Sequence, residues 1–272
     1  MNSSDIQTFL PIVLKACVEA SEVIMQVYET DFDPNIKGDG SPVTKADLLS
    51  NAIIKQALEQ TRIPAIMEEI RNAAFEDRKQ WESVWIVDPL DGTKEFIKKN
   101  DEFAICIALI HQNRPVLGLI ASPVSEEILI GGKEVSPAVV PFGEIDNPEN
   151  WKKILPREEV NRPLQIAGSR SHHSGTELKF NQLMRDAFGE VQFVKKGSAL
   201  KFFDIALGIA DVYPRFAPTM EWDIAAGQAI VEALGGIIEH AETGQPLSYN
   251  KENLYNPYFI VKSKAVIDRL KK

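Results

Sequence analysis

The amino-acid sequence predicts a mixed α/β protein, and three observations support this fold class. Apolar residues recur at helical spacing over residues 4–30, which predicts one long amphipathic helix. Short apolar runs rich in β-branched residues, typical of buried strands, follow between residues 63 and 132. From residue 164 onward, runs of strand length alternate with segments of helical spacing. The 272 residues fit one large domain or two that pack closely.

Composition and charge narrow the possible functions. A net charge of -9 makes a general nucleic-acid-binding surface unexpected. The sequence shows no basic segment of a signal peptide, and charged residues interrupt every apolar stretch before it reaches membrane-spanning length. Cys17 and Cys106 lack the spacing of a metal site or redox pair, so we expect buried, reduced thiols in a cytoplasmic protein. Peripheral association with the inner membrane is left open.

Asp47 is the first candidate functional residue along the chain. Prolines and glycines between residues 31 and 41 are expected to break the helical pattern that precedes it. A second helix should begin near Asp47, with an apolar face made of Leu48, Ala52, Ile53 and Leu58. For Asp47 alone, capping of this helix and interaction with its dipole are sufficient explanations.

A carboxylate-rich turn follows residues 84–87, which we expect to form a buried strand. Pro89 has no N–H to donate, so regular strand pairing is expected to stop there. Gly92 permits a tight fold, in which four oxygen-bearing groups can converge: Asp88, the Leu90 carbonyl, Asp91 and the Thr93 hydroxyl. Such an all-oxygen set suits a hard cation such as Mg²⁺. An ordinary turn is the alternative, because turns favour the same residues.

Glu68 and Glu69 end another apolar run, residues 63–67. They are either a solvated strand edge or carboxylates beside a metal at the carboxyl end of a strand. Further strands are expected at 103–110, 116–120 and 127–130. Residues 134–162 show little periodicity, so we expect a connecting region there, with a domain boundary near 150–163.

The second half contains candidate anion-binding residues. A strand over 164–167 leads into a small, hydroxylated segment with His172 and His173, which either exposes N–H groups to an anion or caps a helix near Ser174. Cations and a hydroxyl able to meet at a phosphate follow on a loop, a helix and a strand: Ser198, Lys201 and Arg215. A solvated face is the alternative. Asp223, near the start of an Ala-rich helix closed by Gly235, is either a cap or a metal ligand.

Four motifs occur together in one order: Glu68-Glu69, Asp88-Pro89-Leu90-Asp91-Gly92-Thr93, Gly197-Ser198-Ala199-Leu200-Lys201 and Trp222-Asp223-Ile224-Ala225-Ala226-Gly227. Over nearly the whole chain, the combination resembles the inositol monophosphatase superfamily of Mg²⁺-dependent, lithium-sensitive phosphatases. The resemblance implies a layered α-β-α-β-α sandwich, with an N-terminal metal-binding half (1–155) and a C-terminal half (156–272) that binds substrate. One departure is Met67, because that position is usually small in the superfamily and a larger side chain could narrow the site.

Within the superfamily, the segments 92–96, 169–172 and 213–219 resemble bacterial 3'(2'),5'-bisphosphate nucleotidases. These enzymes remove the 3'-phosphate of 3'-phosphoadenosine 5'-phosphate (PAP), leaving AMP, and so clear a by-product of sulfate assimilation. An inositol or sugar monophosphatase with the same metal core is one alternative. A non-catalytic nucleotide-binding protein on a phosphatase fold is another. Monomer and homodimer both remain open.

The resemblance also implies roles for individual residues. Two or three Mg²⁺ ions would be held by Glu68, Asp88, the Leu90 carbonyl, Asp91 and Asp223. Asp47 and Thr93 would orient and deprotonate the attacking water, with Glu69 as a further catalytic residue. The phosphorylated nucleotide would be bound by Gly92, Thr93, His172, Ser198, Lys201, Arg215 and Asp223. Within this set, Ser198, Lys201 and Arg215 would hold the 5'-phosphate.

Overall fold

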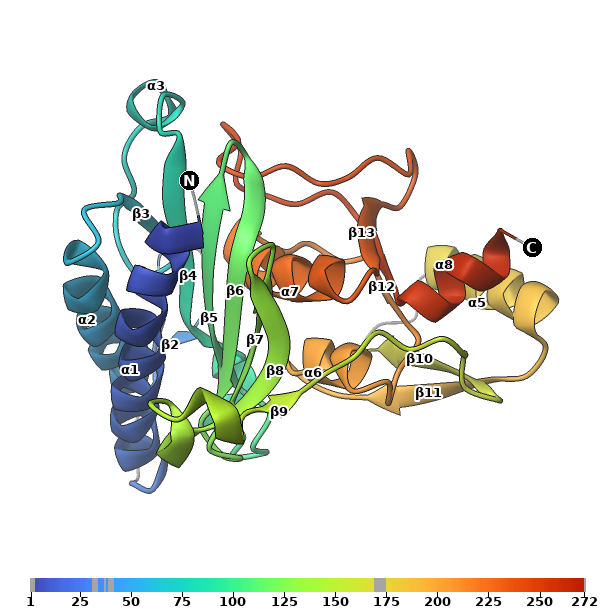
Figure 1. Ribbon diagram of the computed structural model, residues 1–272, viewed down its shortest axis with the longest axis horizontal. Helices are drawn as coiled ribbons and strands as arrows, with labels where there is room; N and C mark the ends of the chain where they lie inside the picture. Colours follow the sequence, from blue (N-terminus) through green and yellow to red (C-terminus); the bar gives the residue numbers. More distant parts are fainter. Residues whose placement is uncertain (1–2, 31–33, 37, 39–41, 169–174, 272) are drawn as a thin grey trace.

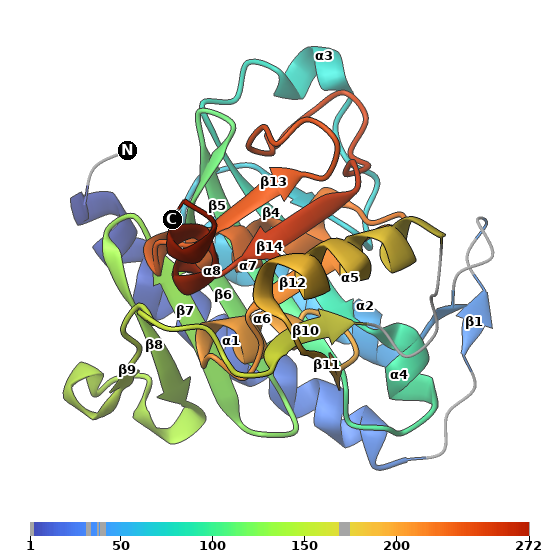
Figure 2. The same ribbon diagram turned by 90° about the vertical axis from the view of Figure 1, so that its right-hand side faces the viewer.

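Five layers of helices and sheets build the structure, a computed structural model that describes residues 3–30, 34–36, 38, 42–168 and 175–271 (Figure 1). Two helices cover one face of a large sheet, two lie between this sheet and a smaller one, and two cover the outer face of the smaller sheet (Figures 1 and 2). In that order they are α1 (Ser3–Tyr28), α2 (Lys45–Glu59), α6 (Lys201–Ala206), α7 (Glu221–Ala233), α5 (Gly175–Phe188) and α8 (Lys264–Leu270). The expected α-β-α-β-α sandwich is confirmed.

The large sheet has seven strands in the order β3-β4-β5-β6-β7-β8-β9. Their bounds are β3 (Ala65–Met67), β4 (Ser83–Asp91), β5 (Ala104–His111), β6 (Arg114–Ser122), β7 (Glu127–Gly132), β8 (Val135–Pro141) and β9 (Lys152–Lys153). Only the pair of β3 and β4 is parallel within this sheet. The carboxyl ends of β3 and β4 therefore lie side by side, which brings the segments that follow the two strands together.

The smaller sheet has five strands in the order β11-β10-β12-β14-β13. Their bounds are β10 (Leu164–Gly168), β11 (Val191–Lys195), β12 (Val212–Arg215), β13 (Ile237–His240) and β14 (Phe259–Lys262). The remaining elements are a two-stranded hairpin and four short helices: β1 (Asn35–Ile36), β2 (Pro42–Val43), α3 (Phe75–Arg78), α4 (Thr93–Ile97) and the 3₁₀ turns Phe142–Glu144 and Pro148–Asn150.

Strand alternation divides the apolar core of the large sheet between its two faces. On β4, Trp85 and Val87 belong to the core that contains α1 and α2. Val84 and Ile86 belong to the core that contains α6, α7 and the smaller sheet. This period of two is the expected pattern for a strand buried on both faces. A third core lies between the smaller sheet and the layer of α5 and α8.

The face that α2 buries differs from the expected one. Leu48 is 51% exposed and Ala52 is also exposed, so the apolar face expected for this helix was wrong at these positions. Leu58 is buried as expected, but half of the buried face is polar: it consists of Ala46, Asp47, Ser50, Asn51, Ile54 and Leu58. Apolar periodicity misjudged which face of this helix is buried, because the helix turns polar side chains toward the interior.

One further expectation about regular structure was wrong, and one strand was not anticipated. Residues 134–162 are not merely a connection, because β8 and β9 extend the large sheet within them. Strand β11 was not anticipated, because exposed polar residues on this edge strand hide its apolar pattern. The division at 155/156 separates the strands of the two sheets, although one core cluster includes residues from both halves. We retain this division as a proposal.

Other expectations agree with the structure. Cys17 and Cys106 are buried free thiols. Among the described residues, no helix is long and apolar enough to cross a membrane.

Gly118 of β6 provides a test of how closely α7 lies on the large sheet. A Cβ atom at this position would lie 2.1 Å from the backbone oxygen of Ala226. We expect Gly118→Ala to lower the free energy of unfolding by about 1–3 kcal/mol, because the helix must move away. Urea denaturation measures this change. Gly143→Ala is the control, since no atom lies within 4 Å of its added Cβ, and equal losses in both variants would contradict the close contact.

Candidate active site

A bulge at the end of β4 places two carboxylates on the same face of the large sheet. Asp88 pairs with Cys106 and Asp91 pairs with Ala104, so three steps along β4 match two steps along β5. In a regular strand, residues three apart would point to opposite faces. The extra residue turns both carboxylates toward the side on which α7 lies. Regular pairing is interrupted at Pro89, as expected, although β4 itself continues through the bulge to Asp91.

The polar groups of the bulge are satisfied locally. The hydroxyl of Ser50, on the buried face of α2, donates to the Pro89 carbonyl at 2.7 Å. The Leu90 N–H donates to Asp88 Oδ1 at 2.9 Å. These bonds replace the ladder bonds that the bulge loses. The unexpected polar face of α2 therefore supports the geometry of the carboxylate turn.

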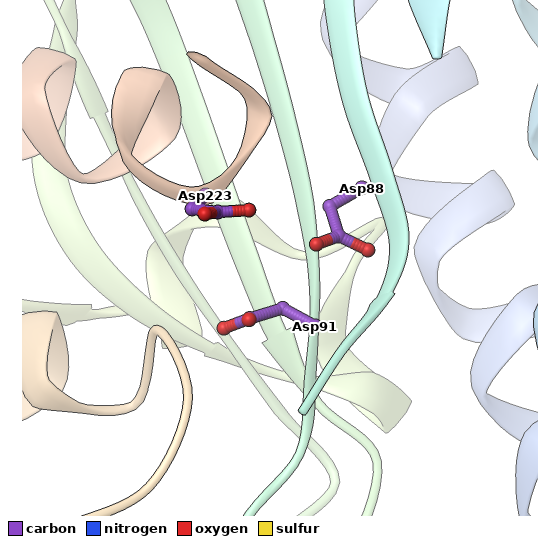
Figure 3. Close-up of side chains that lie close together, drawn as sticks. All are labelled: Asp88, Asp91 and Asp223. Atoms are coloured by element: carbon purple, nitrogen blue, oxygen red, sulfur yellow. The ribbon is translucent and has the colours of Figure 1, made fainter. Parts of the chain in front are cut away.

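Asp223 joins Asp88 and Asp91 from the first turn of α7 (Figure 3). Each of the three residues offers one oxygen, and these oxygens all lie within 4.8 Å of one another. The Met220 N–H donates to Asp223 Oδ2 at 2.8 Å and fixes this carboxylate at the helix N-terminus. Three carboxylates converging in this way form a donor set that fits a hard divalent cation.

Glu68 and Glu69 occupy the turn that follows β3. The Glu68 N–H donates to the Val87 carbonyl at 3.2 Å, which places Glu68 beside the end of β4. Asn72 closes this turn, because its amide accepts from the N–H of Met67 and donates to its carbonyl, both at 2.9 Å. The Met67 side chain is fully buried in the core that contains α1 and α2. It therefore packs away from the carboxylates instead of narrowing their site.

Thr93 and Asp47 are directly hydrogen-bonded. Thr93 Oγ1 donates to Asp47 Oδ1 at 3.0 Å and lies 3.3 Å from the Leu90 carbonyl. The hydroxyl and N–H of Thr44 hold the other oxygen of Asp47, at 2.6 and 2.7 Å. Thr44 was not recognised as a contributor from the sequence, although its spacing from Asp47 is that of a capping box, which this helix forms. The cap thus also fixes a candidate catalytic carboxylate.

Burial raises the pKa values of all three carboxylates, and nearby like charges raise those of Asp88 and Asp223 further. Burial is the largest cause for Asp88, followed by the charge of Glu68, and its pKa lies well above the usual range. Burial and the charge of Asp91 raise the pKa of Asp223 to about 8. Burial also raises the pKa of Asp91, while the Lys201 ammonium opposes that rise. A bound divalent cation would relieve this repulsion and favour the ionised carboxylates.

The causes that shift the pKa of Asp47 differ from those in this cluster. Burial raises the pKa of Asp47, whereas the hydrogen bonds from Thr44 and Thr93 lower it. The carboxylate is only 1% exposed and accepts all of these bonds. A carboxylate held in this way can accept a proton nearer to neutral pH than an exposed aspartate does.

The predicted cations of the second half line a cleft of about 360 Å³ together with Asp91, Gly92, Ser198 and Asp223. Lys201 begins α6 and is 4% exposed, and burial lowers its pKa to about 8. Arg215 ends β12 and is half-buried. The structure therefore brings Lys201 and Arg215 to the same cleft as the carboxylates. His172 lies outside the described residues.

Stability of the metal-free protein should fall as pH rises. An unfolded aspartate has a pKa of about 3.9, so between roughly pH 4 and pH 8 the folded Asp223 holds a proton that the unfolded chain has lost. Asp223→Asn cannot ionise, and its amide oxygen can still accept the Met220 N–H. We expect a smaller loss of unfolding free energy between about pH 6 and pH 8.5 in this variant than in the parent, measured with urea and a chelator. Equal losses would contradict the raised pKa.

Comparison with known proteins agrees with this geometry. The sequence profile of the inositol monophosphatase family matches residues 5–266. The chain is 38% identical over 247 residues to the 3'(2'),5'-bisphosphate nucleotidase CysQ of Shigella flexneri, across 89% of this chain and 94% of that protein. The crystal structure of CysQ from Bacteroides thetaiotaomicron is similar with a TM-score of 0.81 and 36% identity, over 95% of this chain and 97% of that chain.

A more distant likeness concerns the fold alone. An IMPase/NADP phosphatase solved with NADP and Ca²⁺ has a TM-score of 0.75 at 20% identity, over 100% of this chain and 95% of that chain. The family profile spans almost the full length described above, and the CysQ proteins match most of both chains. The chain therefore belongs to the inositol monophosphatase family.

Proposed function

We propose that this protein is a Mg²⁺-dependent 3'(2'),5'-bisphosphate nucleotidase that removes the 3'-phosphate of PAP and releases AMP in sulfur assimilation. The similarity to CysQ nucleotidases over most of the chain supports this activity. The observation that carries the substrate assignment is a single cleft lined by two carboxylates of the acidic cluster and by Lys201 and Arg215. A substrate with two phosphates can place one phosphate beside the carboxylates that would hold metal ions and the other beside Lys201 and Arg215.

We assign the metal ligands from the oxygen donors of the acidic cluster and its neighbours. Mg²⁺ would be held by Glu68, Asp88, the Leu90 carbonyl, Asp91 and Asp223, with two or three ions in all. The mutual repulsion of the buried carboxylates supports this assignment, because a cation neutralises it. The IMPase/NADP phosphatase of the same fold was solved with Ca²⁺. When bound, Mg²⁺ supplies charge neutralisation for the phosphate and lowers the pKa of a coordinated water.

Proton transfer is assigned to Thr93 and Asp47. When the Thr93 hydroxyl donates to Asp47 Oδ1, the shorter of its two contacts, a water beside Thr93 can donate to Oγ1. Asp47 then accepts the proton, while Thr44 keeps its other oxygen fixed. The raised pKa of Asp47 suits a general base that works near neutral pH. We keep Glu69, in the turn with Glu68, as a further catalytic residue.

Substrate recognition is assigned to the second half of the chain and to the turn after β4. Ser198, Lys201 and Arg215 would bind the 5'-phosphate, and Gly92 and His172 would lie beside the nucleotide. A monophosphate such as inositol 1-phosphate would leave Lys201 and Arg215 without a second phosphate to balance their charge, and a partly desolvated charge that is not balanced is costly. Recognition of the second phosphate thus favours PAP over the substrates of the monophosphatase alternative.

Phosphate release from PAP, inositol 1-phosphate and fructose 1,6-bisphosphate tests the proposal directly. We expect Mg²⁺-dependent release that strongly prefers PAP and is lost on adding lithium or a chelator. A preference for inositol 1-phosphate would retain the metal core and reject the assigned 5'-phosphate site. Absence of release from every substrate, together with tight PAP binding, would favour the non-catalytic nucleotide-binding alternative.

Two carboxylate variants should separate metal binding from proton transfer. Asp88→Asn removes the charge of a metal ligand, so turnover should be abolished and Mg²⁺ affinity, measured by calorimetry, should fall. Asp47→Asn removes the proton acceptor, so kcat should fall by about 10²–10⁴-fold with Mg²⁺ affinity retained. Asp186→Asn, on the exposed face of α5, is the matched control. Normal turnover in Asp88→Asn would refute its assignment as a ligand.

Arg215→Ala tests the 5'-phosphate site. Loss of the Arg215 guanidinium removes a charge-assisted hydrogen bond to the phosphate. It should therefore raise KM for PAP by about 10–100-fold and leave kcat within about threefold. The advantage of PAP over inositol 1-phosphate should narrow by the same factor. Arg269→Ala on α8 controls for loss of an arginine. An unchanged preference for PAP would count against the assignment of Arg215.

A further inference from the structure

The loop of residues 196–200, which we name the clasp loop, connects β11 to α6. At the cleft it contacts residues from the first half of the chain. Its Gly197 N–H donates to Glu102 Oε2 at 2.9 Å, and its Ala199 N–H donates to Asp91 Oδ2. Two carboxylates from the first half of the chain thus hold alternate N–H groups of this loop.

The carbonyls of the same loop point to a cation. Lys201 Nζ donates to the carbonyls of Ser198 at 2.7 Å and of Lys196 at 3.2 Å. The loop is therefore fixed on one side by two carboxylates and on the other by Lys201, the first residue of α6. Because Lys201 is buried, the position of its ammonium depends on the position of these carbonyls.

Close packing around Glu102 leaves the clasp loop little room. A Cβ atom at Gly197 would lie 2.9 Å from both Cβ and Oε2 of Glu102. A Cβ atom at Gly92 would lie 2.9 Å from the Glu102 carbonyl and 3.0 Å from Ser198 Cβ. Both glycines thus permit Glu102 and the clasp loop to approach each other between α4 and β5.

The backbone of the clasp loop is in a conformation that needs such support. Ser198 has a φ of 52°, in the left-handed region that residues with a side chain rarely adopt. Such a conformation persists only where surrounding contacts impose it. The hydrogen bonds on both sides of Ser198, at Gly197 and Ala199, are contacts of this kind.

We propose that Glu102 is a positioning residue for substrate binding, which holds the clasp loop through the Gly197 N–H so that Ser198 and Lys201 face the bound phosphate. The role of Glu102 in substrate binding rests on the proposed nucleotidase function. Glu102 is 8% exposed and lines the cleft, but it is not one of the three carboxylates that converge as a candidate cation site. Its removal should therefore impair the binding of PAP far more than turnover at saturation.

Glu102→Ala and Glu102→Gln distinguish a hydrogen-bond acceptor from a charge. Glu102→Ala should raise KM for PAP by about tenfold or more and leave kcat within about threefold, because the bond to Gly197 is lost. Glu102→Gln retains an acceptor oxygen, so its KM should stay within about threefold of the parent. Glu239→Ala is the matched control, since it removes a half-buried glutamate that pairs with Lys262 on the edge of the smaller sheet. Equal defects in Glu102→Gln and Glu102→Ala would overturn the proposal.

Hydrogen exchange on the substrate-free protein tests the clasp independently of activity. We expect exchange of the amides in residues 196–200 to accelerate by about tenfold in Glu102→Ala but not in Glu102→Gln, with other segments unchanged. Unchanged exchange in Glu102→Ala would overturn the proposal even if the parent hydrolyses PAP. If the parent fails to hydrolyse PAP, the nucleotidase assignment fails, and exchange still decides whether Glu102 holds the loop.

Gly197→Ala tests the same contact from the loop. Its added Cβ would lie 2.9 Å from Glu102 and 3.0 Å from Glu95 Cγ, so both side chains must shift. Because Glu102 is displaced, this variant should reproduce the KM increase of Glu102→Ala with kcat retained. If Glu102→Ala does not fold, Gly197→Ala and Glu102→Gln together test the proposal. A KM for PAP equal to that of the parent in Gly197→Ala would overturn the proposal.

Discussion

Repulsion among Asp88, Asp91 and Asp223 is the constraint on which the rest of the site depends. Their oxygens converge within 4.8 Å, and burial weakens the screening that water would provide. Lys201 and Arg215 offset part of this repulsion at Asp91, but burial still raises its pKa. Burial and repulsion favour the protonated forms of these carboxylates, so binding of a cation favours their full negative charge.

This arrangement demands unusual features from the surrounding elements. A bulge must turn Asp88 and Asp91 to one face of the sheet, and α7 must lie close enough to bring Asp223 to them. Gly118 permits that approach, because a side chain there would meet the backbone of α7. The N-terminus of α7 also favours a carboxylate at Asp223 through the helix dipole. The packing of α7 against the large sheet thus determines whether Asp223 reaches the other two carboxylates.

The sequence predicted the residues of the site better than the geometry that joins them. Asp88, Asp91 and Asp223 were identified by motif, and the structure brings them together. The bulge was missed because proline indicates an end of pairing but does not distinguish an end from a distortion. On α2, apolar spacing failed because the buried face carries Asp47 and Ser50, which serve the turn after β4. A rule based on hydrophobicity cannot detect buried polar residues that serve a functional site.

Lys201 and Arg215, two of the basic residues that line the cleft, are not equivalent in what they can offer a substrate. A lysine ammonium has three donors, and Lys201 already uses two of them on the carbonyls of Lys196 and Ser198. At most one remains for a phosphate, so much of the contribution of Lys201 is to shape the loop. Arg215 has a planar guanidinium suited to paired contacts with phosphate oxygens. Discrimination between one and two phosphates should therefore depend more on Arg215 than on Lys201.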